Sequence, residues 1–155
     1  NMVGCVDCHG DRASIHVGNE VELVLNSHPT LACQVCHIPA IARHTSTKVE
    51  WYWSDAGQDI TPPIGPDGRP TYDKKKGTFV WENDVRPELL YFDGKWDRMM
   101  INKNDQYADL PVVLAKPSAD YTTPGAMIYP FKKMIGNQPA DAGNQTMLVP
   151  HLFGL

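Results

Sequence analysis

One short pattern occurs twice and constrains this chain more than any other feature: two cysteines three positions apart, with a histidine directly behind them. Residues 5–9 read Cys-Val-Asp-Cys-His, and residues 33–37 read Cys-Gln-Val-Cys-His. A C-x-x-C-H sequence attaches a c-type haem, because each thiol adds to one vinyl group of the porphyrin while the imidazole reaches the iron. The sequence therefore predicts two covalent haems c, bound by Cys5, Cys8, Cys33 and Cys36, with His9 and His37 as proximal ligands.

Zinc and disulfides are the alternative uses of paired cysteines. Here 24 residues separate the two pairs, which is more than in a usual zinc ribbon, and zinc gives no reason for a histidine after both. A thioredoxin-like redox pair needs only one C-x-x-C and a βαβ setting, which a chain with 12 glycines and 13 prolines does not offer. Covalent haem is the preferred interpretation, with zinc or disulfides as its rivals.

Charge and hydropathy limit the partners and the location. The chain has 14 basic and 18 acidic residues, a net charge of −4, whereas nucleic-acid binding needs a basic face. No apolar run approaches the ~20 residues that span a bilayer. Because c-type haem is attached outside the bacterial cytoplasm, we expect a periplasmic or extracellular protein. The sequence opens without a signal peptide, so we expect a processed N-terminus or a piece of a longer polypeptide.

The haem motifs share a longer pattern that includes a second histidine. His16 lies seven residues after His9, and His44 lies seven after His37, so the unit C-x-x-C-H-x6-H repeats with a period of 28 residues. If Pro39 opens a helix, His37 and His44 lie about 10 Å apart along it. Two axial ligands of one iron have their nitrogens only about 4 Å apart. We therefore expect His44 to ligate a neighbouring haem.

The number of histidines points beyond two haems. Of the six histidines, two are proximal, which leaves His16, His28, His44 and His151 as candidate distal ligands, twice what two bis-histidine haems use. Either some of these are ordinary surface or core histidines, or they reach haems carried elsewhere in a larger protein or in a neighbouring subunit. We assign His28 to the His9 haem. His151 lies among apolar residues, a setting also typical of a core histidine.

The fold class predicted is a multihaem cytochrome c, mostly irregular, with short helices around the haem motifs and a small β-containing C-terminal lobe. We place a dihaem-binding segment at residues 1–60 and a haem-free lobe at 61–155. The aromatic run at 48–59 favours an extended piece, and the proline- and glycine-rich stretch 61–70 favours a surface loop between the two lobes. Short strands are expected at 78–81, 89–92, 112–115 and 126–129.

Longer stretches of the chain resemble the octahaem tetrathionate reductase family of c-type cytochromes. They are Leu31–Arg43, Thr47–Gly57, Lys74–Glu82, Val85–Glu88 and Pro150–Gly154. The resemblance implies a periplasmic or extracellular protein whose bis-histidine haems pass electrons to a catalytic, lysine-ligated haem that reduces tetrathionate, nitrite or hydroxylamine. The chain has two haem motifs where that family has eight, and the family's lysine maps to no residue here. Lys74, Lys75 and Lys76 are expected to form a solvated surface.

We therefore expect an electron-transfer part of a larger multihaem cytochrome, whose partners are other haem-bearing segments or subunits and redox proteins. The alternative is a structural subunit of an extracellular cytochrome filament, in which His16 or His151 ligates a haem of the next protomer. An enzymatic role would require an open or lysine-ligated haem within this segment, and we assign it no catalytic residue.

Overall fold

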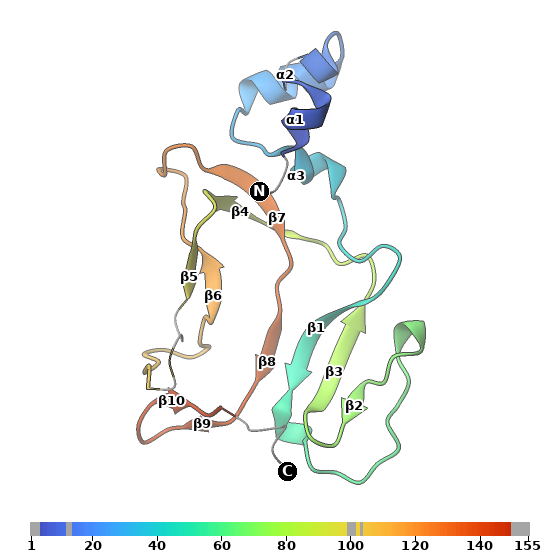
Figure 1. Ribbon diagram of the computed structural model, residues 1–155, viewed down its shortest axis with the longest axis vertical. Helices are drawn as coiled ribbons and strands as arrows, with labels where there is room; N and C mark the ends of the chain where they lie inside the picture. Colours follow the sequence, from blue (N-terminus) through green and yellow to red (C-terminus); the bar gives the residue numbers. More distant parts are fainter. Residues whose placement is uncertain (1–3, 12–13, 99–101, 103, 150–155) are drawn as a thin grey trace. The chain divides into compact units, whose positions relative to one another are not determined.

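The computed structural model describes residues 4–11, 14–98, 102 and 104–149, which fall into two compact units (Figure 1). The first unit consists of Asn1–Pro39, Leu89–Lys95 and Pro117–Pro130. The second consists of Ala40–Glu88, Trp96–Lys116 and Phe131–Leu155. Both units are built from segments that are distant in the sequence, so each depends on tertiary contacts.

Three short helices and a turn hold the haem motifs in the first unit. They are α1 (Cys5–His9), a 3-10 turn (Ser14–His16), α2 (Glu20–Ser27) and α3 (Cys33–His37). The Asn19 side chain caps α2 by accepting from the amides of Val21 (2.9 Å) and Glu22 (3.3 Å). No residue of the three α-helices is buried. The predicted short helices around both cysteine pairs are confirmed.

Helix α3 begins where the chain pairs with a distant strand. Leu31 forms a parallel bridge with Ile128, and the residues on either side of Leu31 make the backbone hydrogen bonds of this bridge. The Ala32 amide donates to the Ile128 carbonyl (3.0 Å), and the Ile128 amide donates to the Thr30 carbonyl (2.6 Å). Ala32 is 3% exposed, so its small side chain is buried where the two backbone segments meet. The second haem motif is thereby fixed to the strand β7 (Met127–Phe131).

A four-stranded sheet forms the centre of the second unit, in the order β2-β3-β1-β8. The strands are β1 (Thr47–Tyr52), β2 (Tyr72–Asp73), β3 (Gly77–Glu82) and β8 (Ile135–Asn137). Strand β3 is antiparallel to β1 and β2, whereas β8 is parallel to β1. Val49, Tyr72 and Phe79 are buried here and form a small core.

Glycines allow two backbone segments to come close to β1. A Cβ atom on Gly77 would lie 2.0 Å from the Tyr52 carbonyl oxygen, and one on Gly136 would lie 2.2 Å from that of Trp51. Gly77 also has a φ of +83°, in the left-handed region that glycine tolerates best. Strand β1 therefore pairs closely on both sides only because these two positions carry no side chain.

Three two-stranded sheets complete the described structure. Strand β4 (Glu88–Phe92) pairs with β7, β5 (Trp96–Arg98) with β6 (Ala115–Pro117), and β9 (Ala140–Asp141) with β10 (Thr146–Met147). The strands expected at 78–81, 89–92 and 126–129 are confirmed. The strand expected at 112–115 is wrong over 112–114, because β6 starts at Ala115 and its partner is only three residues long.

The structure has no helix directly after Pro39, which the expected spacing of His37 and His44 had assumed. Helix α3 ends at His37, Ile41 pairs with Val85, and Ala42 has a φ of +65°, which an α-helix does not allow. The tertiary pairing of Ile41 overrides the local helix signal of Pro39. The helical spacing of His37 and His44 thus loses its basis, and a neighbouring haem for His44 stays a prediction.

The stretch 61–70 contains one 3-10 turn (Pro66–Gly68) and an isolated antiparallel bridge between Ile64 and Pro70, and is otherwise irregular, as expected for a loop. The chain on both sides of it belongs to the second unit. The predicted division into a haem-binding segment at 1–60 and a haem-free lobe at 61–155 describes where haem is bound. It stays a prediction.

Candidate functional site

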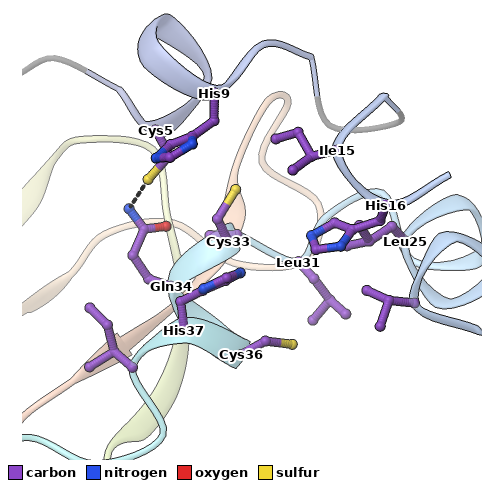
Figure 2. Close-up of a pocket in the computed structure, with 13 residues that line it drawn as sticks. Cys5, His9, Ile15, His16, Leu25, Leu31, Cys33, Gln34, Cys36 and His37 are labelled. Carbon is purple, nitrogen blue, oxygen red and sulfur yellow. Dashed lines mark hydrogen bonds between the residues drawn. The ribbon is translucent and has the colours of Figure 1, made fainter. Parts of the chain in front are cut away.

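A cavity of about 520 Å³ lies within the first unit and is lined by parts of both haem motifs. Cys5 and His9 come from the first motif, and Cys33, Cys36 and His37 come from the second; His16 lines the cavity between them in sequence. Figure 2 shows these side chains around the opening. The volume falls in the range of about 300–1,000 Å³ that is usual for cofactor pockets.

The second motif places its three functional side chains on a single helical turn. Residues three and four apart share one face of an α-helix, so Cys36 and His37 lie on the same side as Cys33. All three line the cavity. The helix is held at its start by β7, and it ends where the Ile38 amide donates to the Gln34 carbonyl (2.9 Å). This arrangement can present two thiols and one imidazole to the same porphyrin.

The first motif opens on the same cavity with two of its three side chains. Gly4 caps the start of helix α1, and its amide donates to Asp7 Oδ2 (2.6 Å); Gly10, with a φ of +80°, follows the end of the helix. Cys5 and His9 are four residues apart and line the cavity. Gln34 Nε2, on α3, donates to Cys5 Sγ at 3.6 Å. This bond links the two motif helices directly.

The remaining walls of the cavity are apolar. They are formed by Ile15, Val21, Leu25, Leu31 and Ile38, with Ala32 at the base of α3. Ile15 and Val21 are each 41% exposed and Ile38 is 39% exposed, so large apolar surface faces the opening. A porphyrin is a flat apolar ring that needs thiols and an imidazole at fixed points. The donor set and the walls together fit a haem c.

The geometry gives no support to the rival uses of cysteine. No disulfide bond joins any two of the four cysteines in the structure. Over the described residues, no group of three or more His, Cys, Asp or Glu side chains is arranged to hold a metal ion. Haem attachment remains the interpretation that explains both cysteine pairs and both adjacent histidines.

The candidate distal histidines lie in different places. His16, in the 3-10 turn, lies in the cavity with its ring centroid 6.3 Å from that of His37. His28 caps the end of α2 through its amide, which donates to the Val24 carbonyl (2.9 Å). His44 lies in the irregular segment before β1, in the second unit. His151 lies outside the described residues. The cavity therefore brings His16 together with the two motifs.

The three consecutive lysines form the turn between β2 and β3. Lys74 Nζ lies 2.5 Å from Asp59 Oδ1, and the Lys74 side chain is 58% exposed. The Lys76 carbonyl accepts from Trp51 Nε1 (2.7 Å). This arrangement agrees with the solvated surface expected of these residues.

Sequence reasoning missed the surroundings of Lys48. Its Nζ lies 3.5 Å from the ring centroid of Phe79, 4.6 Å from that of Trp51 and 5.3 Å from that of Trp81. Burial and the nearby charge of Lys76 lower the pKa of Lys48. The pairing of β1 with β3 sets Lys48 opposite Trp81, so a register prediction could have found this contact.

No helix in the described part of the chain is both long enough and apolar enough to cross a membrane.

Comparison with known proteins places the chain among cytochromes. The family model for bacterial cytochrome c matches residues 48–155, which is more than half of the chain. The crystal structure of octahaem cytochrome c from Shewanella oneidensis matches with a TM-score of 0.80 and 38% sequence identity, over 97% of this chain and 33% of that one. No curated protein matches the chain.

The resemblance found in the sequence is confirmed, and the structure has a multihaem cytochrome c fold. The chain spans about a third of the length of the octahaem cytochrome it matches. Cytochromes c carry covalent haem, and Cys5/Cys8 and Cys33/Cys36 fit two attachment motifs. The family model covers the β-rich part, which contains no such motif, so the likeness rests on more than the cysteine pairs. The chain belongs to the bacterial cytochrome c family.

Proposed function

We propose that this chain carries two covalent haems c and conducts electrons as part of a longer multihaem cytochrome. His9 and His37 are the proximal ligands, and Cys5, Cys8, Cys33 and Cys36 hold the porphyrins. The observation that carries the proposal is that both motif helices open on one apolar cavity and are linked through Gln34 and Cys5. Two haems attached there would lie close together, as electron transfer between them requires.

The chain's own residues would set the properties of each haem. When bound, a haem exchanges single electrons at its iron. His9 and His37 would hold the iron through their imidazoles, and ligand identity, burial and nearby charge are the terms that would set its potential. The apolar walls formed by Ile15, Leu25 and Leu31 would keep water from the porphyrin face. The role that this arrangement would support is electron transfer.

The proposed role also implies partners for this chain. They are other haem-bearing segments of the same or a neighbouring chain, together with redox proteins that exchange electrons with this one. Covalent haem attachment places it in the periplasm or outside the cell. The resemblance suggests that the longer protein reduces tetrathionate, nitrite or hydroxylamine. That reaction needs an open or lysine-ligated iron, and we assign no residue of this chain to it.

The test is a count of covalent haems in the full-length protein. Replacing Cys33 and Cys36 with alanine should reduce the mass by one haem, and replacing Cys5 and Cys8 should do the same. The two double variants serve as controls for each other, and the quadruple variant should lose two haems. Mass spectrometry and the absorbance of reduced haem measure the count. An unchanged haem count in either double variant would contradict the proposal.

A further inference from the structure

His16 and His37 face each other within one cavity, although 20 residues lie between them in the sequence. His16 is the last residue of its 3-10 turn, and His37 is the last residue of α3. Figure 2 shows both rings directed into the space between the two segments. Their centroids are 6.3 Å apart, and the ring planes are inclined by 38°. The two rings are tilted against each other and do not stack face to face.

The separation has the length that one iron between two imidazoles requires. A metal lies about 2.0–2.1 Å from an imidazole nitrogen. The centre of a ring with delocalised bonds of ~1.33 Å lies about 1.1 Å behind that nitrogen. Two imidazoles on opposite sides of one iron therefore have centroids about 6 Å apart. Each ring turns freely about its bond to the metal, so an inclination of 38° is compatible with this arrangement.

We propose that His16 is the distal ligand of the haem held by Cys33, Cys36 and His37. This inference rests on the proposed function, because it needs that haem to be attached. Cys33 and Cys36 lie on the helical face that carries His37, and His16 approaches from the opposite segment. The iron would then have two imidazole ligands and no position for substrate.

The pairing also explains the repeated spacing of the histidines. The trailing histidine of the first C-x-x-C-H-x6-H unit serves the haem of the second unit and not its own. If the second unit follows the same rule, His44 serves a haem attached beyond it, and this chain contains no third motif. The pairing also gives His16 a role inside its own chain. The filament alternative, by contrast, used His16 to reach a neighbouring protomer.

The experiment uses the full-length, haem-loaded protein and measures iron spin state. In the His16→Ala variant, one ferric haem should change from low spin to high spin in electron paramagnetic resonance, and added imidazole should restore the low-spin signal. Val17→Ala is the matched control, because Val17 directly follows His16, is 69% exposed and is not among the residues that line the cavity. It should leave the spin state of every haem unchanged.

A second variant covers the case in which His16→Ala fails to assemble. His16→Met keeps a ligand atom, so it should retain a low-spin iron, and its potential should be more positive because methionine ligation raises haem potentials. A low-spin count unchanged in His16→Ala, or a potential unchanged in His16→Met, would overturn the pairing. Absence of haem from Cys33 and Cys36 in the parent protein would instead overturn the proposed function.

Discussion

Val49 on β1, Tyr72 on β2 and Phe79 on β3 are 8%, 4% and 7% exposed, so each of these strands contributes one side chain to a small core. Among residues 5–11 and 15–37 of the helical segment, Ala32 alone is buried, so there is no comparable cluster there. No residue of α1, α2 or α3 is buried, and Leu23 and Val24 of α2 are 71% and 46% exposed. The sheet is held by its own side chains, whereas the helical segment leaves apolar surface uncovered.

The lengths of the helices also indicate that the helical segment is less stable by itself than the sheet. Helices α1 and α3 have five residues each and α2 has eight, whereas isolated helices shorter than about 12–15 residues are marginal in water. Capping by Asn19 stabilises the start of α2, and the backbone bond to β7 stabilises the start of α3. Each of these contacts acts on one helix end. The difference indicates that the haems proposed for this segment would cover apolar surface that its own side chains leave exposed. The helical segment should therefore depend on haem attachment, and the sheet should not.

The largest expected effect separates the two regions directly. In the full-length protein with Cys33 and Cys36 replaced by alanine, backbone amides of α2 and α3 should exchange with solvent nearly as fast as in an unfolded peptide, because the helices lose the ring that covers them. Amides of β1 and β3 should keep their protection. Hydrogen exchange followed by mass spectrometry measures both. Full protection of α2 in the variant would show that the helices need no haem.

The reverse experiment removes the core of the sheet. Phe79→Ala should lower the stability of the second unit by about 3–5 kcal/mol, the usual cost of deleting a buried aromatic ring. The ring also packs on Trp51 and Trp81, at centroid distances of 5.7 and 6.3 Å. Hydrogen exchange in β1 and β3 measures the loss, and haem absorbance should not change. Ile64→Ala, at a site 68% exposed in the same unit, is the control and should have little effect.

The smallest effect concerns the contact between the loop at 61–70 and the start of β1. The Ser46 amide donates to Asp67 Oδ2 at 2.5 Å, and this bond holds the pKa of Asp67 below its ordinary value of 3.8. A lowered folded-state pKa means that the stabilisation is complete above pH 3.8 and is lost as the pH falls through the folded pKa.

Asp67→Asn should therefore be slightly less stable than the parent protein at neutral pH, and the difference should vanish in acid. The midpoint of urea unfolding, followed by tryptophan fluorescence over a pH series, measures it. Asp59→Asn is the control, because Asp59 pairs with the exposed Lys74 side chain, and such surface ion pairs contribute little to stability. A difference between Asp67→Asn and the parent that does not depend on pH would show that the carboxylate charge has no part in the contact.

Local sequence signals were sufficient where an element depends on its own residues. The strands at 78–81 and 89–92 follow β-branched and aromatic runs bounded by turn residues, and both formed. The signals failed where a distant partner decides the outcome. Ile41 pairs with Val85 and prevents a helix after Pro39, and the strand expected from Val112 starts only at Ala115, opposite a partner three residues long.

The sequence by itself determined the cofactor chemistry, because thiol spacing and an adjacent imidazole are covalent requirements of haem attachment within five consecutive residues. It also determined that histidines outnumber the proximal positions. Only the tertiary structure decided which of them meet. His16 and His37 meet at one cavity, and α3, which carries His37, is held to β7 by backbone bonds between Ala32 and Ile128, which lie 96 residues apart in the sequence. Contacts over such separations depend on how the whole chain packs, and no local pattern records them.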